Sequence, residues 1–402
     1  MSLPKYLHKG VEHMKDQTAL SMKVVKINPF GAQTFSASGT RDITFKLPRT
    51  GVLVGTKSYF YFNVKPDGDA AADDELMSDV HTVFDNFRIE IGSQEIINEP
   101  EYGWWRSLEF NAQASESDLT SASSSVMNIP DSSTSGTFKK YRVPLASKWH
   151  NKGLFSAPLP LYKLDQVTLE WRINNTLAEY TTATTAVTSL DIQDCVLELY
   201  IVDGPELRRL FDQDIVREFE TFFYYHTTAV NGATQLSVNI PCSVQNLKGL
   251  AMVQRASADP IDPNWQTGTA IENYKYSQSF RTNSLTKFSV SIDGITYPDS
   301  KPIDGTNSVE LVSNLERFWG LERLGAWFDD QTLVATSSKG YYAISFNPSD
   351  DDGVSGVSLV NKSGTIVALA DLTVGANTDV DFFLKYSKFI KIDKSGAISV
   401  TK

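Results

Sequence analysis

Apolar and polar residues alternate in short stretches spread over most of the chain, and this period of two is the pattern of half-buried β-strands. The clearest alternating runs are residues 43–47, 87–91, 167–173, 195–201, 236–240 and 288–292. Residues 59–64 are apolar or aromatic at nearly every position, which predicts a central strand. Because helical spacing is confined to short segments, the pattern predicts an all-β protein built of sandwiches rather than a parallel α/β sheet.

One alternating pattern occurs twice, about half the chain length apart. Residues 87–92 read Phe-Arg-Ile-Glu-Ile-Gly, and residues 288–294 read Phe-Ser-Val-Ser-Ile-Asp-Gly. An aromatic segment with helical spacing follows each copy: Trp104, Trp105 and Leu108 follow the first, and Leu315, Phe318 and Trp319 follow the second. Residues 43–48 and 236–241 form a second related pair, and both end in proline. The chain is therefore expected to contain two copies of one β-rich unit.

A chain of 402 residues suits two domains of roughly 200 residues each. The predicted division is an N-terminal arm at 1–40, a first sandwich at 41–204, a linker helix at 205–216 and a second sandwich at 217–402. Pro205 fits the first turn of that linker helix. Three stretches rich in polar residues are predicted to be long exposed loops: 113–137, 174–189 and 256–279.

The arm differs from the rest of the chain in both pattern and charge. Its apolar residues recur at spacings of three and four, which predicts a helix with a narrow apolar stripe: Leu3, Leu7, Val11 and Met14. Its basic residues are Lys5, Lys9, Lys15, Lys23 and Lys26. Such an arm fits either packing under neighbouring subunits or contact with an anionic membrane surface, and a solvated terminal helix is the alternative.

The whole chain is acidic, with a net charge of −11 and a pI near 5.0. Residues 1–26 carry five lysines against Glu12 and Asp16, a net +3, so the remainder carries −14. Sequence-specific binding of nucleic acid is therefore not expected. There is no signal peptide and no apolar run long enough to span a bilayer, so we expect a soluble protein made in a reducing compartment. Cys195 and Cys242 are predicted to be buried free thiols.

The sequence offers no recognisable catalytic or metal-binding motif. The five histidines are scattered, and neither a His-Glu-x-x-His motif nor a phosphate-binding loop is present. His226 follows a run of aromatic residues and is expected to be a hydrogen-bonded structural residue. The acidic run 350–352 lacks the ligand spacing of a calcium loop and is expected to be a solvated turn. We therefore predict no enzyme and no cofactor.

Several stretches resemble the double jelly-roll major capsid proteins of tectiviruses, adenoviruses, virophages, polinton-like viruses and large nucleocytoplasmic DNA viruses. Residues 342–348 with 355–356 and 361–363 are similar to a block in the second jelly roll of the large DNA viruses, with Val354 where that block has proline. Residues 383–392 are similar to the closing strand, and residues 288–298 to a polinton-type pattern. The positions that match the family are Phe346, Pro348, Ser355, Gly356, Tyr386 and Gly396.

The resemblance implies two tandem eight-stranded jelly-roll sandwiches with short helices in the loops and an N-terminal helical arm. It further implies homotrimers that act as pseudo-hexameric capsomers and tile the icosahedral shell of a double-stranded DNA virus. Expected partners are neighbouring capsomers, minor capsid or penton proteins and, through the arm, an internal membrane. Synthesis in the host cytoplasm and a final location in the virion follow. Deletion of residues 1–26 is expected to leave a folded trimer that closes shells poorly.

Two other functions remain open from the residues alone. A two-domain carbohydrate- or receptor-binding viral spike would use exposed aromatic side chains as a sugar platform, and the candidates are Trp104, Trp105, Trp319 and Trp327. Aromatic residues at helical spacing more often belong to a core. A β-sandwich glycosidase would need two carboxyl groups about 5 Å apart, if retaining, and no pair stands out in the sequence.

Overall fold

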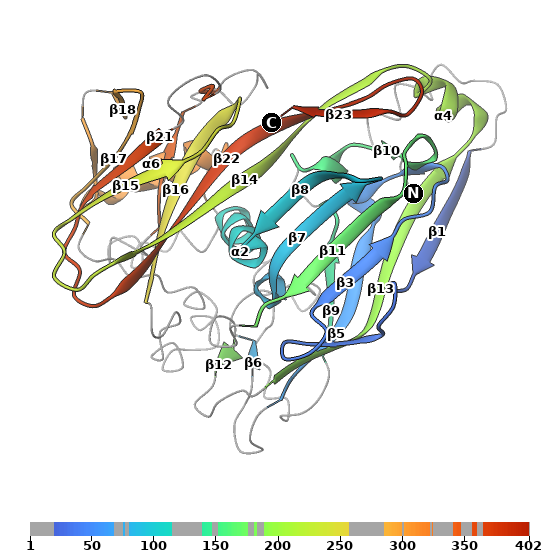
Figure 1. Ribbon diagram of the computed structural model, residues 1–402, viewed down its shortest axis with the longest axis horizontal. Helices are drawn as coiled ribbons and strands as arrows, with labels where there is room; N and C mark the ends of the chain where they lie inside the picture. Colours follow the sequence, from blue (N-terminus) through green and yellow to red (C-terminus); the bar gives the residue numbers. More distant parts are fainter. Residues whose placement is uncertain are drawn as a thin grey trace.

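The computed structural model describes residues 20–67, 75–76, 80–114, 139–146, 152–175, 181–182, 189–256, 285–299, 301–321, 324, 341–346, 356–359 and 365–401. Within these residues the chain forms two β-sandwiches joined by a short helix (Figure 1). All paired strands are antiparallel. The predicted loops 113–137, 174–189 and 256–279 lie almost entirely outside the described residues.

The first sandwich consists of two main sheets. One sheet contains β1 (Ser21–Ile27), β2 (Thr34–Ser36), β4 (Val52–Leu53), β5 (Tyr59–Asp67), β9 (Lys139–Pro144), β10 (Leu159–Pro160) and β13 (Ser189–Asp203). The facing sheet has the order β3 (Asp42–Lys46), β11 (Val167–Ile173), β7 (Phe84–Ile91) and β8 (Gln94–Pro100). A separate pair is formed by β6 (Glu75–Leu76) and β12 (Thr181–Thr182). The alternation of apolar and polar side chains along β11 shows why one face of this sheet is buried, because all apolar residues of β11 point into the core between the two sheets.

The second sandwich is built in the same way. One sheet contains β14 (Ile215–Ala229), β22 (Thr378–Ile392), β16 (Leu247–Ala256) and β20 (Tyr341–Ser345), with β23 (Ile398–Thr401) beside β22. The other contains β15 (Gln235–Pro241), β21 (Thr365–Asp371), β17 (Lys287–Ile292) and β18 (Ile295–Tyr297), with β19 (Ile303–Asp304) beside β17.

The two sandwiches have the same strand order. The order β1-β13-β5-β9 in the first corresponds to β14-β22-β16-β20 in the second, and β3-β11-β7-β8 corresponds to β15-β21-β17-β18. Each sandwich is therefore an eight-stranded jelly roll with additional short strands. The repeated sequence pattern occupies equivalent strands, β7 and β17. Gly92 and Asp293 follow them with positive φ values of 63° and 51°, which explains the small turn residue after each copy. The predicted duplication is confirmed.

A helix follows the equivalent hairpin in each sandwich, as the sequence predicted. These helices are α2 (Tyr102–Gln113) and α6 (Ser308–Trp319). The side chain of Asn307 accepts a hydrogen bond from the backbone of Glu310 at the start of α6, and Gly320 ends the helix in a left-handed conformation. Helix α4 (Pro205–Leu210) lies in the predicted linker 205–216 but is shorter than predicted, because the first strand of the second sandwich already begins at Ile215. Single 3₁₀ turns are η1 (Gly55–Lys57), η2 (Val80–Val83), η3 (Leu154–Ser156) and η4 (Leu161–Lys163).

One sequence-based prediction is wrong in part. Residues 1–40 were expected to form an arm, but β1 and β2 belong to the first sandwich. β1 pairs with β13 over its whole length, and Val25 and Ile27 pack against the first core. Five of its seven side chains are exposed, namely those of residues 21–24 and of Lys26, so the apolar alternation that marks a strand is weak here. Residues 1–19 lie outside the described residues.

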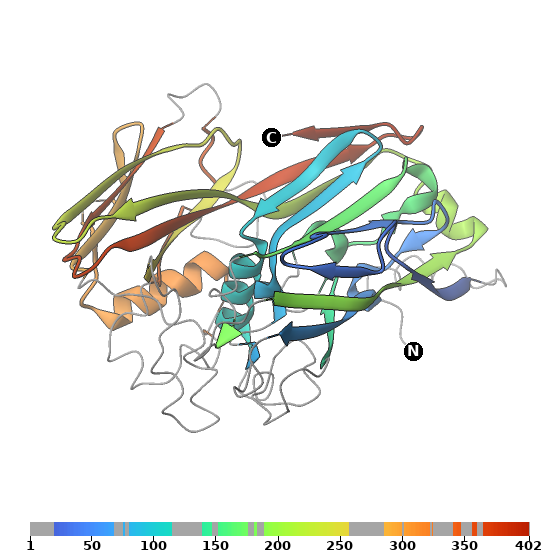
Figure 2. The same cartoon turned by 60° about the horizontal axis from the view of Figure 1, so that its bottom comes forward.

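The long strands of the second sandwich run on along the first. In Figure 1, β14 and β22 extend past α2 towards α4, and β23 lies beside them. Phe219, Ile390 and Ile392 on these extensions are buried in the core of the first sandwich. In Figure 2, α2 and α6 lie close together where the two sandwiches meet.

Candidate functional site: the interface between the two sandwiches

A third apolar core joins the two sandwiches. It combines side chains of α2, of α6 and of the outer face of the sheet that contains β14, β16, β20 and β22. Trp105 of α2 lies at its centre, with ring centroids 4.7 Å from Phe222, 5.1 Å from Trp319 and 5.6 Å from Phe383. Trp104, Trp105 and Trp319 are all buried, so these three indoles do not form an exposed sugar platform. Trp327 lies outside the described residues.

A buried ion triad is next to this core. Arg106 of α2 donates to Glu99 at the end of β8 over 2.9 Å and to Glu109 over 2.7 Å. Burial alone would lower the pKa of Arg106, but the two carboxylates outweigh it and raise that pKa above its ordinary value. The hydroxyl of Thr221 on β14 donates to the other oxygen of Glu99 over 2.9 Å. The triad therefore connects the first sandwich to the second.

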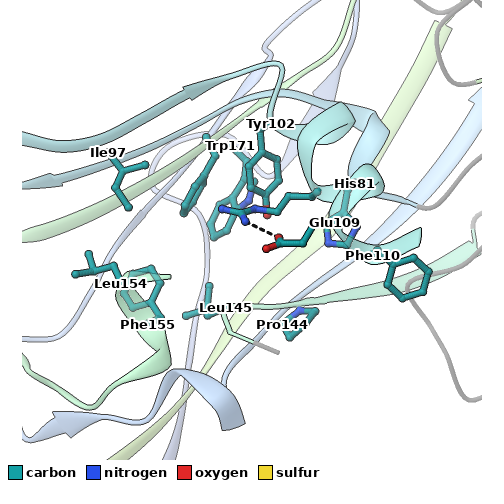
Figure 3. A pocket seen from close by; sticks show the side chains of 12 residues that line it. His81, Ile97, Tyr102, Glu109, Phe110, Pro144, Leu145, Leu154, Phe155 and Trp171 are labelled. Atoms are coloured by element: carbon teal, nitrogen blue, oxygen red, sulfur yellow. Dashed lines mark hydrogen bonds and ion pairs between the residues drawn. The ribbon is translucent and has the colours of Figure 1, made fainter. Parts of the chain in front are cut away.

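A small cavity lies beside the triad, inside the first sandwich (Figure 3). Its volume is about 40 Å³, and Tyr102, Glu109 and Trp171 face it. Burial raises the pKa of Tyr102 to about 12, so this phenol stays protonated at neutral pH. The space suits one or two water molecules. It is far below the roughly 300 Å³ of a ligand pocket. Glu99 and Glu109, the two acidic residues beside this cavity, both form ion pairs with Arg106 and do not face each other as a catalytic acid and base.

Two buried lysines tie β14 into the interface. Lys248 on β16 lies 3.0 Å from Glu218 and 3.3 Å from Glu220. Lys385 on β22 donates to the backbone carbonyl of Phe318 at the end of α6, and it lies 4.0 Å from Glu220. The backbone N–H of Glu220 donates to the carbonyl of Lys152 in the first sandwich over 2.8 Å. Each buried ammonium is therefore compensated by acidic or carbonyl oxygen.

A second buried charge cluster is centred on Asp381 of β22. Its carboxylate accepts from Arg255, from the Tyr224 hydroxyl over 2.7 Å, and lies 3.0 Å from Nδ1 of His226. Burial would raise the pKa of Asp381, but Arg255 and these hydrogen bonds hold it below its ordinary value. The hydrogen bond to Asp381 raises the pKa of His226. Because the Arg255 guanidinium also lies 4.8 Å from the ring of Trp104, this cluster touches α2 as well.

The C-terminal end of the chain also contacts the first sandwich. Gly396, in the turn between β22 and β23, has a φ of 93°, and a Cβ at this position would overlap the carbonyl oxygen of Lys163. Lys388 on β22 donates to the carbonyl of Ile96 on β8 over 3.1 Å. Glycine at position 396 is thus required both by its own backbone and by the close approach of the first sandwich.

Of the five lysines predicted for the arm, two lie among the described residues. Lys23 and Lys26 lie on β1, and Lys26 pairs with Glu198 of β13 over 3.4 Å. Lys5, Lys9 and Lys15 lie outside the described residues.

Three of the family-like positions meet at the start of β16. Phe346 donates its N–H to the carbonyl of Lys248, and Tyr386 lies opposite Leu247. A Cβ on Gly356 would overlap the side chain of Asn246. Phe346 and Tyr386 are both in the second core, so their role here is packing. Gly396 lies apart, and Pro348 and Ser355 lie outside the described residues.

Sequence reasoning missed the charged residues that hold the interface. A signal was present in the sequence: Asp381 and Lys385 stand among the apolar residues of 380–386, where a charged side chain is unexpected. His226 and the two cysteines were predicted correctly: His226 is hydrogen-bonded, and Cys195 and Cys242 are buried and free. Burial raises the pKa of each of these thiols to about 12.

Among the described residues, no group of three or more His, Cys, Asp or Glu side chains is placed to hold a metal ion. No helix in the same residues is long and apolar enough to cross a membrane.

Comparisons with known proteins identify relatives by structure only. No family model matches the sequence, and no curated protein matches it. The structure is similar to the crystal structure of PBCV-1 VP54 that was fitted into a cryo-EM reconstruction of the virophage Sputnik, with a TM-score of 0.67, 14% identity, and coverage of 96% of this chain and 98% of that chain. A quasi-atomic model of the PBCV-1 virus capsid gives a TM-score of 0.66, 14% identity and the same coverage, 96% and 98%.

The cryo-EM structure of the Sputnik virophage gives a TM-score of 0.52 at 12% identity, with 95% of this chain and 88% of that chain covered. The similarity therefore extends over both sandwiches and the connection between them. The chain has the double jelly-roll fold of these viral structures, as the sequence resemblance implied.

Proposed function

We propose that this chain is a major capsid protein whose copies form homotrimeric, pseudo-hexameric capsomers and tile an icosahedral viral shell. The observation that carries the proposal is the duplication: one chain contains two jelly rolls with the same strand order, joined by a large buried interface. A trimer of such chains presents six similar units around one axis, which approximates the symmetry of a hexagonal tile. The structural similarity to PBCV-1 VP54 and to the Sputnik virophage over nearly the whole chain supports the same function.

The interface described above has a clear role in such a protein. A capsomer needs its two jelly rolls in one fixed relation, because the contacts between neighbouring capsomers depend on their relative position. Trp105 and the ion triad of Arg106 provide a fixed relation, since they are buried and each contacts both sandwiches. Buried polar groups specify one arrangement because any other leaves charges without partners.

Other partners follow from the same proposal. Neighbouring capsomers and minor capsid or penton proteins would contact the outer surfaces, and residues 1–19 with Lys5, Lys9 and Lys15 would reach the shell interior or an internal membrane. A lysine near an anionic lipid surface contributes about 1 kcal/mol to binding. The acidic remainder of the chain, with −14 against +3 for residues 1–26, favours solubility of free capsomers. The protein would act in the virion as a structural component and not as an enzyme.

The test is assembly of the purified chain. We expect light scattering to give the mass of three chains, and electron microscopy of concentrated protein or of its source particles to show pseudo-hexagonal tiles. A carbohydrate-binding spike would instead bind glycans as a monomer or small ring, and a glycosidase would hydrolyse a glycoside. A chain that stays monomeric at high concentration would refute the capsid proposal.

A further inference from the structure

The last two strands of the second sandwich extend beyond that sandwich and pack on the first. Residues 389–392 of β22 pair with β23, and we call residues 389–401 the C-terminal hairpin. The same part of β22 pairs on its other side with the start of β14. In Figures 1 and 2 this three-stranded extension runs beside β8 towards α4.

The C-terminal hairpin belongs to the second sandwich by strand pairing but to the first by burial. Ile390 and Ile392 are fully buried, and both lie in the core of the first sandwich. Ile398 and Val400 on β23 are partly buried against that same core. Phe219 near the start of β14 is a buried member of it as well. The core of the first sandwich therefore contains side chains that its own strands do not supply.

Two close contacts seat the hairpin on the first sandwich. Lys388, directly before the hairpin, donates to the backbone carbonyl of Ile96 on β8 over 3.1 Å. In the turn of the hairpin, Gly396 lies so close to η4 that a Cβ would overlap the carbonyl oxygen of Lys163. The hairpin therefore rests on two elements of the first sandwich, β8 and η4.

We infer that the C-terminal hairpin is a latch for the first sandwich: the first core closes only when the hairpin docks, and release of the hairpin opens the first sandwich while the second stays folded. The second sandwich can stay folded because β16 pairs with β22 only at residues 378–386. Among the described residues, no buried side chain of the second core comes from the hairpin. The latch is a property of a single chain and goes beyond the proposed assembly of copies.

The latch makes the first sandwich depend on a segment that is synthesised long after it. All described strands of the first sandwich end before residue 204, so they leave the ribosome before residues 389–401. Until the hairpin docks, the apolar side chains that contact Ile390 and Ile392 lack this cover, and apolar surface exposed in this way promotes aggregation. Under the proposed function, only chains that extend through the hairpin would present a closed first sandwich for assembly.

Removal of the hairpin tests the latch. In a chain truncated after Lys388, we expect the backbone amides of β7 and β11 to exchange with solvent roughly a hundredfold or more faster, because two buried isoleucines are lost from the first core. Exchange in β17 and β21 of the second sandwich should stay within about threefold of the unchanged protein. Hydrogen exchange followed by mass spectrometry measures both sandwiches in one sample.

Gly396→Ala weakens the latch in the full-length chain. Alanine at this position is strained by the φ of 93° and overlaps the Lys163 carbonyl, so the hairpin has to move away from η4. We expect exchange in β7 and β11, but not in β17 and β21, to become roughly tenfold faster. Gly232→Ala is the matched control, because Gly232 has a φ of 84° but no described atom lies within 4 Å of a Cβ there. This control keeps the backbone strain and omits the overlap.

Unchanged exchange in the first sandwich of both latch variants would overturn the inference. Equal acceleration in both sandwiches would also overturn it, because it would show a general loss of stability. If the truncated chain does not stay soluble, the comparison of Gly396→Ala with Gly232→Ala decides alone. None of these results bears on the capsid proposal, which the mass of the assembled protein tests separately.

Discussion

Arg106 shows how a single residue stabilises the relation between the sandwiches, because it neutralises the buried Glu99 and the largely buried Glu109. In Arg106→Met both carboxylates stay buried without their cation, and we expect the free energy of unfolding to fall by about 3–5 kcal/mol. Urea denaturation followed by tryptophan fluorescence measures the change. Arg209→Met is the control: its partner Glu206 is on the surface, so a loss below about 1 kcal/mol is expected. Equal losses in the two variants would mean that the triad has no special role.

His226 should make stability depend on pH in the neutral range. Its hydrogen bond to Asp381 raises its pKa above 6.5, and Asp379 lies 3.9 Å from Nε2, while Arg255 opposes the shift. A pKa raised by folding contributes stability that is complete below the unfolded value and is lost as the pH rises through the folded value. We therefore expect the denaturation midpoint to fall as the pH rises above about 6.5 and through the raised pKa of folded His226.

His226→Gln keeps a polar side chain but does not titrate, so the fall in this pH range should become smaller. The lowered pKa of Asp381 acts in a different range, because its contribution is lost only as the pH falls below about 3.8. A midpoint with the same pH dependence in both proteins would show that His226 does not contribute.

At the scale of elements, helix α2 of the first sandwich packs against the second sandwich and couples the two. Trp105→Ala removes the ring that contacts Phe222, Phe383 and Trp319, at an expected cost of about 3–5 kcal/mol. Because this core couples the two sandwiches, calorimetry should show one unfolding transition dividing into two. Trp171→Ala is a matched control in the first core, and it should lower the midpoint without dividing the transition. A single unchanged transition in Trp105→Ala would contradict the coupling.

The elements differ in how far the sequence predicts them, for a physical reason. Strands β7 and β17 can be recognised from the sequence because each has one face in a core. Burial of that face imposes an alternation of apolar and polar residues with a period of two. β1 escapes this rule, since its apolar Met22 and Val24 are exposed and its inward residues Val25 and Ile27 are only partly buried. An exposed strand at the edge of a sheet therefore shows only a weak alternation of apolar and polar residues. For this reason the sequence alone places β1 in the arm.

For the interface between the two sandwiches, the sequence predicted only the types of residue that it contains. The aromatic residues of α2 and α6 are visible in the sequence as candidates for a core, yet nothing local indicates that they meet in the same core. The pairing of Arg106 with Glu99, or of Arg255 with Asp381, joins positions whose separation along the chain carries no signal. Such contacts follow from the packing of α2 beside β8 and from the pairing of β16 with β22, which no local pattern in the sequence indicates.

At the scale of the whole molecule, the position of β1 changes the expected result of truncation. Deletion of residues 1–26 removes nearly all of β1, including Met22, Val24 and Val25, and leaves the edge of β13 unpaired. We expect lower stability, association through the exposed strand edge and no defined trimer, in contrast to the folded trimer that the sequence alone suggested.

Deletion of residues 1–19 is the matched comparison, because it keeps β1 and its pairing with β13. This shorter deletion should leave the thermal midpoint and the trimer mass unchanged, while particle yield in an assembly reaction falls because the lysines at positions 5, 9 and 15 are lost. The two truncations therefore separate folding and trimer formation, which depend on β1, from shell assembly, which is assigned to the residues before it. A stable trimer after deletion of residues 1–26 would show that β1 is dispensable for both folding and trimer formation.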